Sequence, residues 1–135
     1  MLIMTNHHSA LLIGYRYILG FLAAYFFLMG ALLVFFPQLL LERLGQPATP
    51  AIVGILRGAG GATIPYTLLY ILFATKPGER QWIGYVILLA NGLAIILDLF
   101  SLFRAEYTPM QSLIDLPVEI LSFVVIFAFR RKFVS

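Results

Sequence analysis

The sequence predicts an all-α membrane protein, a four-transmembrane-helix up-down bundle with a short interfacial helix in its first loop. Of its 135 residues, 61% are hydrophobic and only 11% are charged, whereas soluble domains average about 25% charged residues. Four apolar runs also reach the length of about 20 residues that a spanning helix needs. The four spans cover about residues 10–36, 50–74, 82–103 and 109–129, so residues 1–135 form a single transmembrane domain.

The first apolar run is predicted to be a membrane anchor. It is longer than the roughly 7–15 residues of a signal-peptide core, and no cleavage site follows it. The loop after it holds about two helical turns, from Gln38 to Leu44, followed by Gly45, where a helix C-cap belongs. We expect a short interfacial helix there, with a solvated loop as the alternative.

Short connections order the remaining spans. Thr49-Pro50 is a typical helix start, with Thr at the N-cap and Pro at the first helical position. Pro77-Gly78 is a turn signal between the second and third spans. Such short loops make neighbours in sequence antiparallel neighbours in space, which gives the up-down order of the bundle.

The basic residues predict the orientation. Arg16, Lys76, Arg80, Arg130, Arg131 and Lys132 fall on one side of the membrane, and Arg43, Arg57 and Arg104 on the other. Cytoplasmic segments carry the excess of Lys and Arg, so both termini are expected in the cytoplasm. The expected location is the bacterial inner membrane.

Composition excludes several kinds of function. The chain has no Cys, so disulfides, thiolate metal sites and Cys nucleophiles are excluded. His7 and His8 are adjacent and do not share a helix face, so we expect no metal site, no cofactor and no catalytic set. We attribute the net charge of +3 to the basic C-terminal tail, which is expected to contact lipid headgroups. No nucleic-acid partner is expected.

Charged and polar residues inside the apolar runs are the candidate site. A charge at the bilayer centre costs about 2.5–3.5 kcal/mol on insertion scales, so such residues are usually paired and functional. Helical spacing places Asp115, Glu119 and Ser122 on one face, and Asn91 and Asp98 on another. The candidate charge cluster or ligand-binding set is Arg57, Asn91, Asp98, Asp115, Glu119 and Ser122.

The predicted cluster has more acids than bases. Three carboxyl groups meet the single guanidinium of Arg57, at similar depth in the outer half of the bundle. We therefore expect at least one acid to be protonated, or a cation or cationic ligand to complete the site. Gly61, Pro65, Tyr66 and Tyr25 are the predicted pocket lining, with a Pro kink widening the space. The alternatives are an internal ion-pair network that only fixes the bundle, and an interface with another membrane subunit.

These features resemble the DoxX-like small four-helix membrane family, including relatives named only as domains of unknown function. The resembling residues are Pro37, Leu44-Gly45, Arg57-Gly58-Ala59-Gly60-Gly61, Trp82, Asn91, Asp98, Asp115 and Glu119, ahead of a basic tail. The resemblance implies a bundle with polar residues in its core, and some members associate with redox complexes. A more distant likeness is to sterol-isomerase and sigma-2-receptor-like bundles, in which carboxylates meet cationic lipids. That likeness would give this role to Asp98, Asp115 and Glu119.

Three functions are compatible with these features. The first is binding of an amphipathic or hydrophobic ligand, such as a lipid, a quinone or an amine-like molecule. The alternative is an accessory or structural subunit of a larger membrane complex, and the third is a small transporter. The expected partners are membrane lipids, a hydrophobic small molecule, and a membrane-protein partner or a second copy. General acid–base chemistry by Asp115 and Glu119 is chemically possible, but an enzyme is the least favoured function.

Overall fold

A computed structural model describes the backbone of residues 2–105 and 109–133, and the side chains of residues 12–105 and 113–128. Every regular element in this described part is an α-helix, as predicted. The helices are α1 (Leu2–Phe35), α2 (Pro37–Arg43), α3 (Pro50–Thr75), α4 (Gln81–Phe103) and α5 (Pro109–Phe133).

Among the residues whose side chains are described, three helical segments are long and apolar enough to cross a membrane. The spans are Leu12–Phe35 in α1, Pro50–Thr75 and Gln81–Phe103. Large apolar side chains are exposed along all four long helices, as expected of surfaces that contact lipid. Helix α5 covers the predicted fourth span but is the least apolar of the long helices, because it contains Asp115 and Glu119 and ends in the basic residues Arg130, Arg131 and Lys132.

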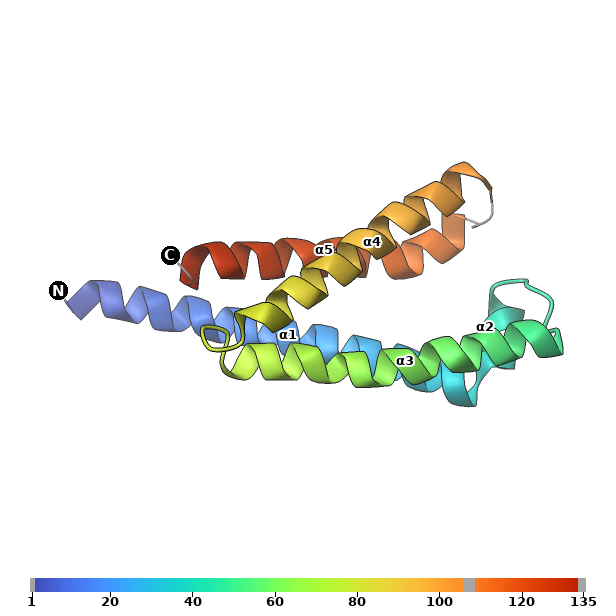
Figure 1. Cartoon of the computed structure of the whole chain (residues 1–135), viewed down its shortest axis with the longest axis horizontal. Helices are drawn as coiled ribbons and strands as arrows, with labels where there is room; N and C mark the ends of the chain where they lie inside the picture. The colour runs from blue at the N-terminus through green and yellow to red at the C-terminus, as the bar shows by residue number, and fades with distance from the viewer. Residues whose placement is uncertain (1, 106–108, 134–135) are drawn as a thin grey trace.

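The long helices alternate in direction (Figure 1). Both termini and the α3–α4 connection lie at one end of the molecule, which we call the terminal end. Helix α2 and the far ends of α4 and α5 lie toward the other, which we call the α2 end. Helix α1 packs chiefly on α3, and α4 chiefly on α5, so the fold consists of two helical pairs.

The α1–α3 pair is held at short range by two glycines. A Cβ added to Gly60 would lie 2.6 Å from the carbonyl oxygen of Gly30 and 2.7 Å from the Cβ of Leu33. Small residues allow membrane helices to approach this closely. By contrast, a Cβ at Gly54, Gly58 or Gly61 would meet no atom within 4 Å. The face of α3 that carries Gly60 therefore packs within the chain, whereas the face that carries Gly54, Gly58 and Gly61 does not.

The two pairs join at the terminal end and diverge toward the α2 end (Figure 1). Their shared core lies at the terminal end and consists of Leu19, Leu22, Ala23, Tyr70, Phe73, Ile83, Ile87, Val125 and Ile126. Beyond Asn91 in α4, and before Ser122 in the described part of α5, no side chain is fully buried. The α2 end thus has room between the pairs, and this room forms the candidate site.

The local structure confirms two predictions and corrects one boundary. Helix α2 forms where the short helix was predicted, and Gly45 ends it with φ of +66°, a conformation that favours glycine. The Thr49 hydroxyl accepts a hydrogen bond from Ile52 N at 3.3 Å, capping α3 as predicted. Helix α1, however, begins at Leu2, so helical structure starts before residue 10, where the first span was predicted to begin.

Candidate ligand-binding site

Four polar side chains join α3, α4 and α5 where the helical pairs meet. The Asn91 amide donates hydrogen bonds to the hydroxyls of Tyr66 at 3.1 Å and Tyr70 at 3.0 Å. The Tyr70 and Ser122 hydroxyls are hydrogen-bonded to each other at 2.5 Å. We call Tyr66, Tyr70, Asn91 and Ser122 the polar node. The last three are buried, and a satisfied buried network of this kind fixes the relative position of its helices.

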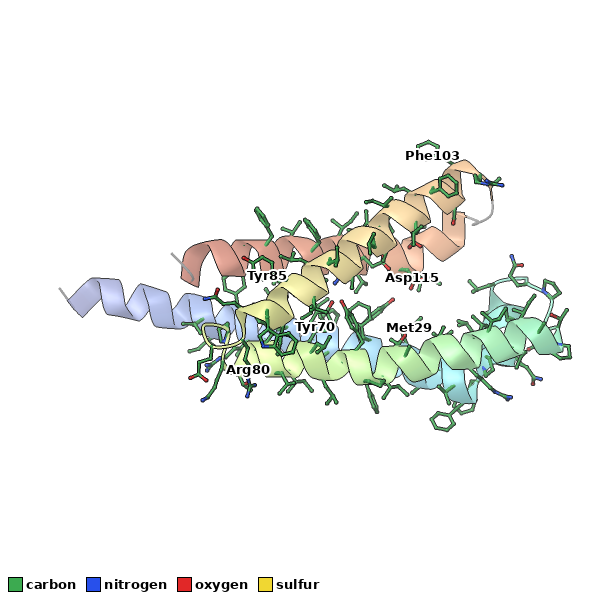
Figure 2. All side chains as sticks on the ribbon, viewed as in Figure 1. Met29, Tyr70, Arg80, Tyr85, Phe103 and Asp115 are labelled. Carbon is green, nitrogen blue, oxygen red and sulfur yellow. The ribbon has the colours of Figure 1, made fainter. Side chains whose placement is uncertain are left out.

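Aromatic packing ties α1 to the polar node. The Phe26 ring stacks on Tyr70 with centroids 5.2 Å apart, and it meets Tyr66 edge-on at 5.7 Å. Contacts of this geometry add about 0.5–1.5 kcal/mol beyond burial. Figure 2 shows Tyr70 between α3 and α4, on the terminal side of the open region. The node and Phe26 therefore form the floor of the space between the helical pairs.

Three carboxyl groups gather above this floor, and we call Asp98, Asp115 and Glu119 the acidic triad. Each interacts electrostatically with at least one of the others, and the Asp98 and Glu119 carboxyls are in hydrogen-bonding contact. One oxygen of each of these two, Oδ2 of Asp98 and Oε2 of Glu119, is buried without a hydrogen-bond donor. Ionised carboxylates only accept hydrogen bonds. The contact between Asp98 and Glu119 is therefore favourable only if one of them is protonated or a cation lies beside them.

The structure does not bring Arg57 to the acids, so its predicted place in the cluster is wrong. The Arg57 side chain is exposed, and none of the three acids lies within ion-pair distance of it. Leu56 faces the space beside the acids, and successive helical residues point about 100° apart. Arg57 therefore lies on another side of α3, where its long side chain can extend toward the membrane surface. The acidic triad therefore lacks the positive charge that the predicted cluster included.

The larger of two cavities beside the triad has a volume of about 440 Å³, and we call it the amphipathic cavity. Its lining comes from α1, α2, α3, α5 and the loop after α2: Tyr25, Phe26, Met29, Leu33, Leu40, Leu41, Leu44, Gln46, Ile52, Leu56, Thr63, Ile114, Asp115 and Glu119. Its walls are thus mainly apolar, and two carboxyl groups contribute the negative charge. A neighbouring cavity of about 330 Å³ reaches Tyr66, Asn91 and Glu119.

Both helical pairs contribute to the amphipathic cavity. Met29 of α1 and Asp115 of α5 are two of its lining residues, and Figure 2 shows them on opposite sides of the space between the pairs. Tyr25 of α1 reaches across this space, because its hydroxyl donates a hydrogen bond to the Ile114 carbonyl at 2.9 Å. Leu41 of α2 is 5% exposed and closes the α2 end.

Two of the four predicted lining residues are at the site and two are not. Tyr25 and Tyr66 line the cavities beside the triad. Gly61 and Pro65 are exposed, and Pro65 instead lines a separate apolar cavity between α1 and α3. Sequence reasoning missed the leucines of α2 and Met29. The apolar run Leu39-Leu40-Leu41 was the available signal for α2, and nothing in the sequence marked Met29.

The lining favours one kind of ligand chemistry. No Lys, Arg or His is among the residues that line either cavity in the described part of the chain. Negative charge in a site with apolar walls favours a cation, since charges attract more strongly there than in water. Comparisons with protein-family models, with curated proteins and with solved structures found no match.

Proposed function

We propose that the chain is a four-span bundle in which α5 is the fourth transmembrane helix. The support is the alternating direction of the four long helices and the placement of both termini at one end (Figure 1). Six of the nine basic residues lie at that end or in the loop beside it, which favours the cytoplasm there. Helix α2 then lies at the outer membrane surface, and the acidic triad lies in the outer half of the bundle.

We propose that this bundle binds an amphipathic molecule with a cationic head group and an apolar tail. The observation that carries the proposal is the amphipathic cavity, with apolar walls from α1, α2 and α3 and carboxyl groups of α5. Its volume of about 440 Å³ falls within the roughly 300–1,000 Å³ of small-molecule sites. The cationic end would lie against Asp115 and Glu119, with the tail toward Leu40 and Leu44.

Both ends of such a ligand gain free energy in the cavity. The tail contacts the apolar walls, at about 25 cal/mol for each Å² removed from water. The head group supplies the positive charge and a hydrogen-bond donor for Glu119, which lines the cavity and has an oxygen without a donor in the protein. An anionic head group would instead meet the carboxyl groups of Asp115 and Glu119 and be repelled.

Three probes of equal tail length test this preference: dodecylamine, dodecanol and dodecanoic acid. Each is added to the purified protein in nanodiscs of neutral lipid, and the thermal unfolding midpoint is measured. We expect dodecylamine to raise the midpoint most, because its positive charge should give it the lowest Kd of the three. A ligand at one hundred times its Kd adds about 2.7 kcal/mol of stability. Equal shifts with dodecanol would show that the charge is not used. A larger shift with dodecanoic acid would contradict the proposal outright.

A further inference from the structure

One side-chain hydrogen bond ties the two helical pairs together next to the amphipathic cavity. The Tyr25 hydroxyl of α1 donates to the Ile114 carbonyl of α5 at 2.9 Å. Both residues line the cavity. Four further side-chain hydrogen bonds between the pairs belong to the polar node, nearer the terminal end. The Tyr25 contact is thus separated from the main junction.

The packing around this contact is suited to movement. The shared core of the two pairs lies at the terminal end, and the pairs diverge toward the α2 end (Figure 1). The described α5 side chains from Leu113 to Leu121 are at most partly buried. Segments with few buried contacts open at low free-energy cost. Because α4 packs chiefly on α5, the α2 end of the α4–α5 pair can therefore swing about the polar node as a unit without disrupting the core.

The backbone of α5 is interrupted next to the Tyr25 contact. Pro117 lies inside the helix, and a proline has no N–H to donate to the carbonyl four residues earlier. The interruption falls at Leu113, next to the Ile114 carbonyl that Tyr25 binds. Proline kinks are common places for a membrane helix to bend. The hydrogen bond of Tyr25 thus meets α5 at the turn that is easiest to displace.

We propose that Tyr25 is the latch of a gate into the amphipathic cavity, with the polar node as the hinge. When the latch is closed, α5 covers the cavity and holds Asp115 and Glu119 against it. When the Tyr25 hydroxyl releases Ile114, the α2 end of the α4–α5 pair moves away from α1 and a ligand can enter. The identity of the ligand that enters rests on the proposed function, whereas the opening movement of the helices does not.

Spin-label distances in the ligand-free protein test the latch. Because the chain has no Cys, a label pair can be placed by Ile55→Cys in α3 and Leu97→Cys in α4, which are 70% and 60% exposed. A second pair, Ile71→Cys and Val86→Cys, lies nearer the terminal end at exposed positions. In Tyr25→Phe we expect a longer or broader distance distribution for the first pair and an unchanged one for the second.

The size of the effect follows from the single hydrogen bond removed. A neutral hydrogen bond contributes about 0.5–1.5 kcal/mol net, which converts to about a two- to twelvefold larger open population. Tyr17→Phe is the matched control, since Tyr17 is an exposed tyrosine of the same helix, 77% exposed. An unchanged first pair in Tyr25→Phe would overturn the latch. Equal changes in both pairs would overturn the hinge, because they would mean general loosening.

A dodecylamine arm separates this inference from the proposed function. If both proposals hold, dodecylamine enters and leaves Tyr25→Phe about two- to twelvefold faster than the unsubstituted protein, in line with the larger open population. If dodecylamine binds neither protein while the Ile55–Leu97 label distance still increases, the proposed function fails and the gate stands. If dodecylamine binds both at equal rates and the distance is unchanged, the gate fails and the binding site stands.

Discussion

Glu119→Gln is expected to abolish the preference of the protein for dodecylamine over dodecanol. The substitution keeps the shape of the side chain and removes one negative charge from the wall of the amphipathic cavity. Loss of a charged partner in a partly buried site costs about 2 kcal/mol or more, which corresponds to more than tenfold weaker binding. Binding of dodecanol should change little, since the apolar walls are untouched.

The same substitution should leave the ligand-free protein at least as stable as before. Glu119 contacts the Asp98 carboxyl and has a buried oxygen without a donor. A glutamine amide has two N–H donors and can donate to Asp98, which removes the contact between two acceptors. Lost amine binding therefore cannot be attributed to unfolding if the midpoint of ligand-free Glu119→Gln is equal or higher.

The measurement is the thermal shift in nanodiscs with dodecylamine and with dodecanol. Glu42→Gln is the matched control, because Glu42 is an exposed acid of α2 outside the cavity lining. It removes the same charge from the chain and should keep the preference. A Glu119→Gln protein that still prefers dodecylamine would show that the negative charge of Glu119 does not recognise the head group.

Gly60→Ala is expected to destabilise the fold, whereas Gly61→Ala, one residue along, should have little effect. A methyl group at Gly60 would lie 2.6 Å from the Gly30 carbonyl oxygen, 2.7 Å from Leu33 Cβ and 2.9 Å from Val34 Cγ2. The first of these is backbone, so α1 and α3 must separate. Overpacking of this kind costs about 1–3 kcal/mol. At Gly61 the methyl group meets nothing within 4 Å.

Thermal unfolding of the two variants in nanodiscs checks this pair. The intrinsic helix preference of alanine over glycine is the same at both positions, so the difference between the variants isolates the α1–α3 contact. We expect a lower midpoint for Gly60→Ala and an equal or slightly higher one for Gly61→Ala. Equal midpoints for the two variants would mean that α1 and α3 do not approach at Gly30 and Gly60.

Hydropathy and turn residues predicted the helices because both depend on local sequence. Apolar runs of spanning length predicted the long helices. Gly45 correctly marked the end of α2, and Thr49 the start of α3. The spacing of Asp115, Glu119 and Ser122 also predicted a shared face. Glu119 lines both cavities, and Ser122 lies about one turn deeper in the polar node.

The direction in which α3 faces was not predictable in the same way. Arg57 was assigned to the acids because buried charges need partners, but a side chain this long can avoid the bilayer core without one. The glycines did not indicate the packing face, since Gly58, Gly60 and Gly61 lie within four consecutive residues and only Gly60 packs against α1. The divergence of the helical pairs depends on contacts between distant segments, which no local pattern records.

Occupation of the amphipathic cavity by a cationic amphiphile is tested most directly by protection of a single thiol. Met29→Cys places the thiol in the cavity lining, and Leu28→Cys places one on the neighbouring position of α1, which is 61% exposed. We predict that dodecylamine slows maleimide labelling of Met29→Cys and not of Leu28→Cys, and that dodecanol protects less. Labelling of Met29→Cys that dodecylamine leaves unchanged, or slows equally at Leu28→Cys, would contradict binding in this cavity.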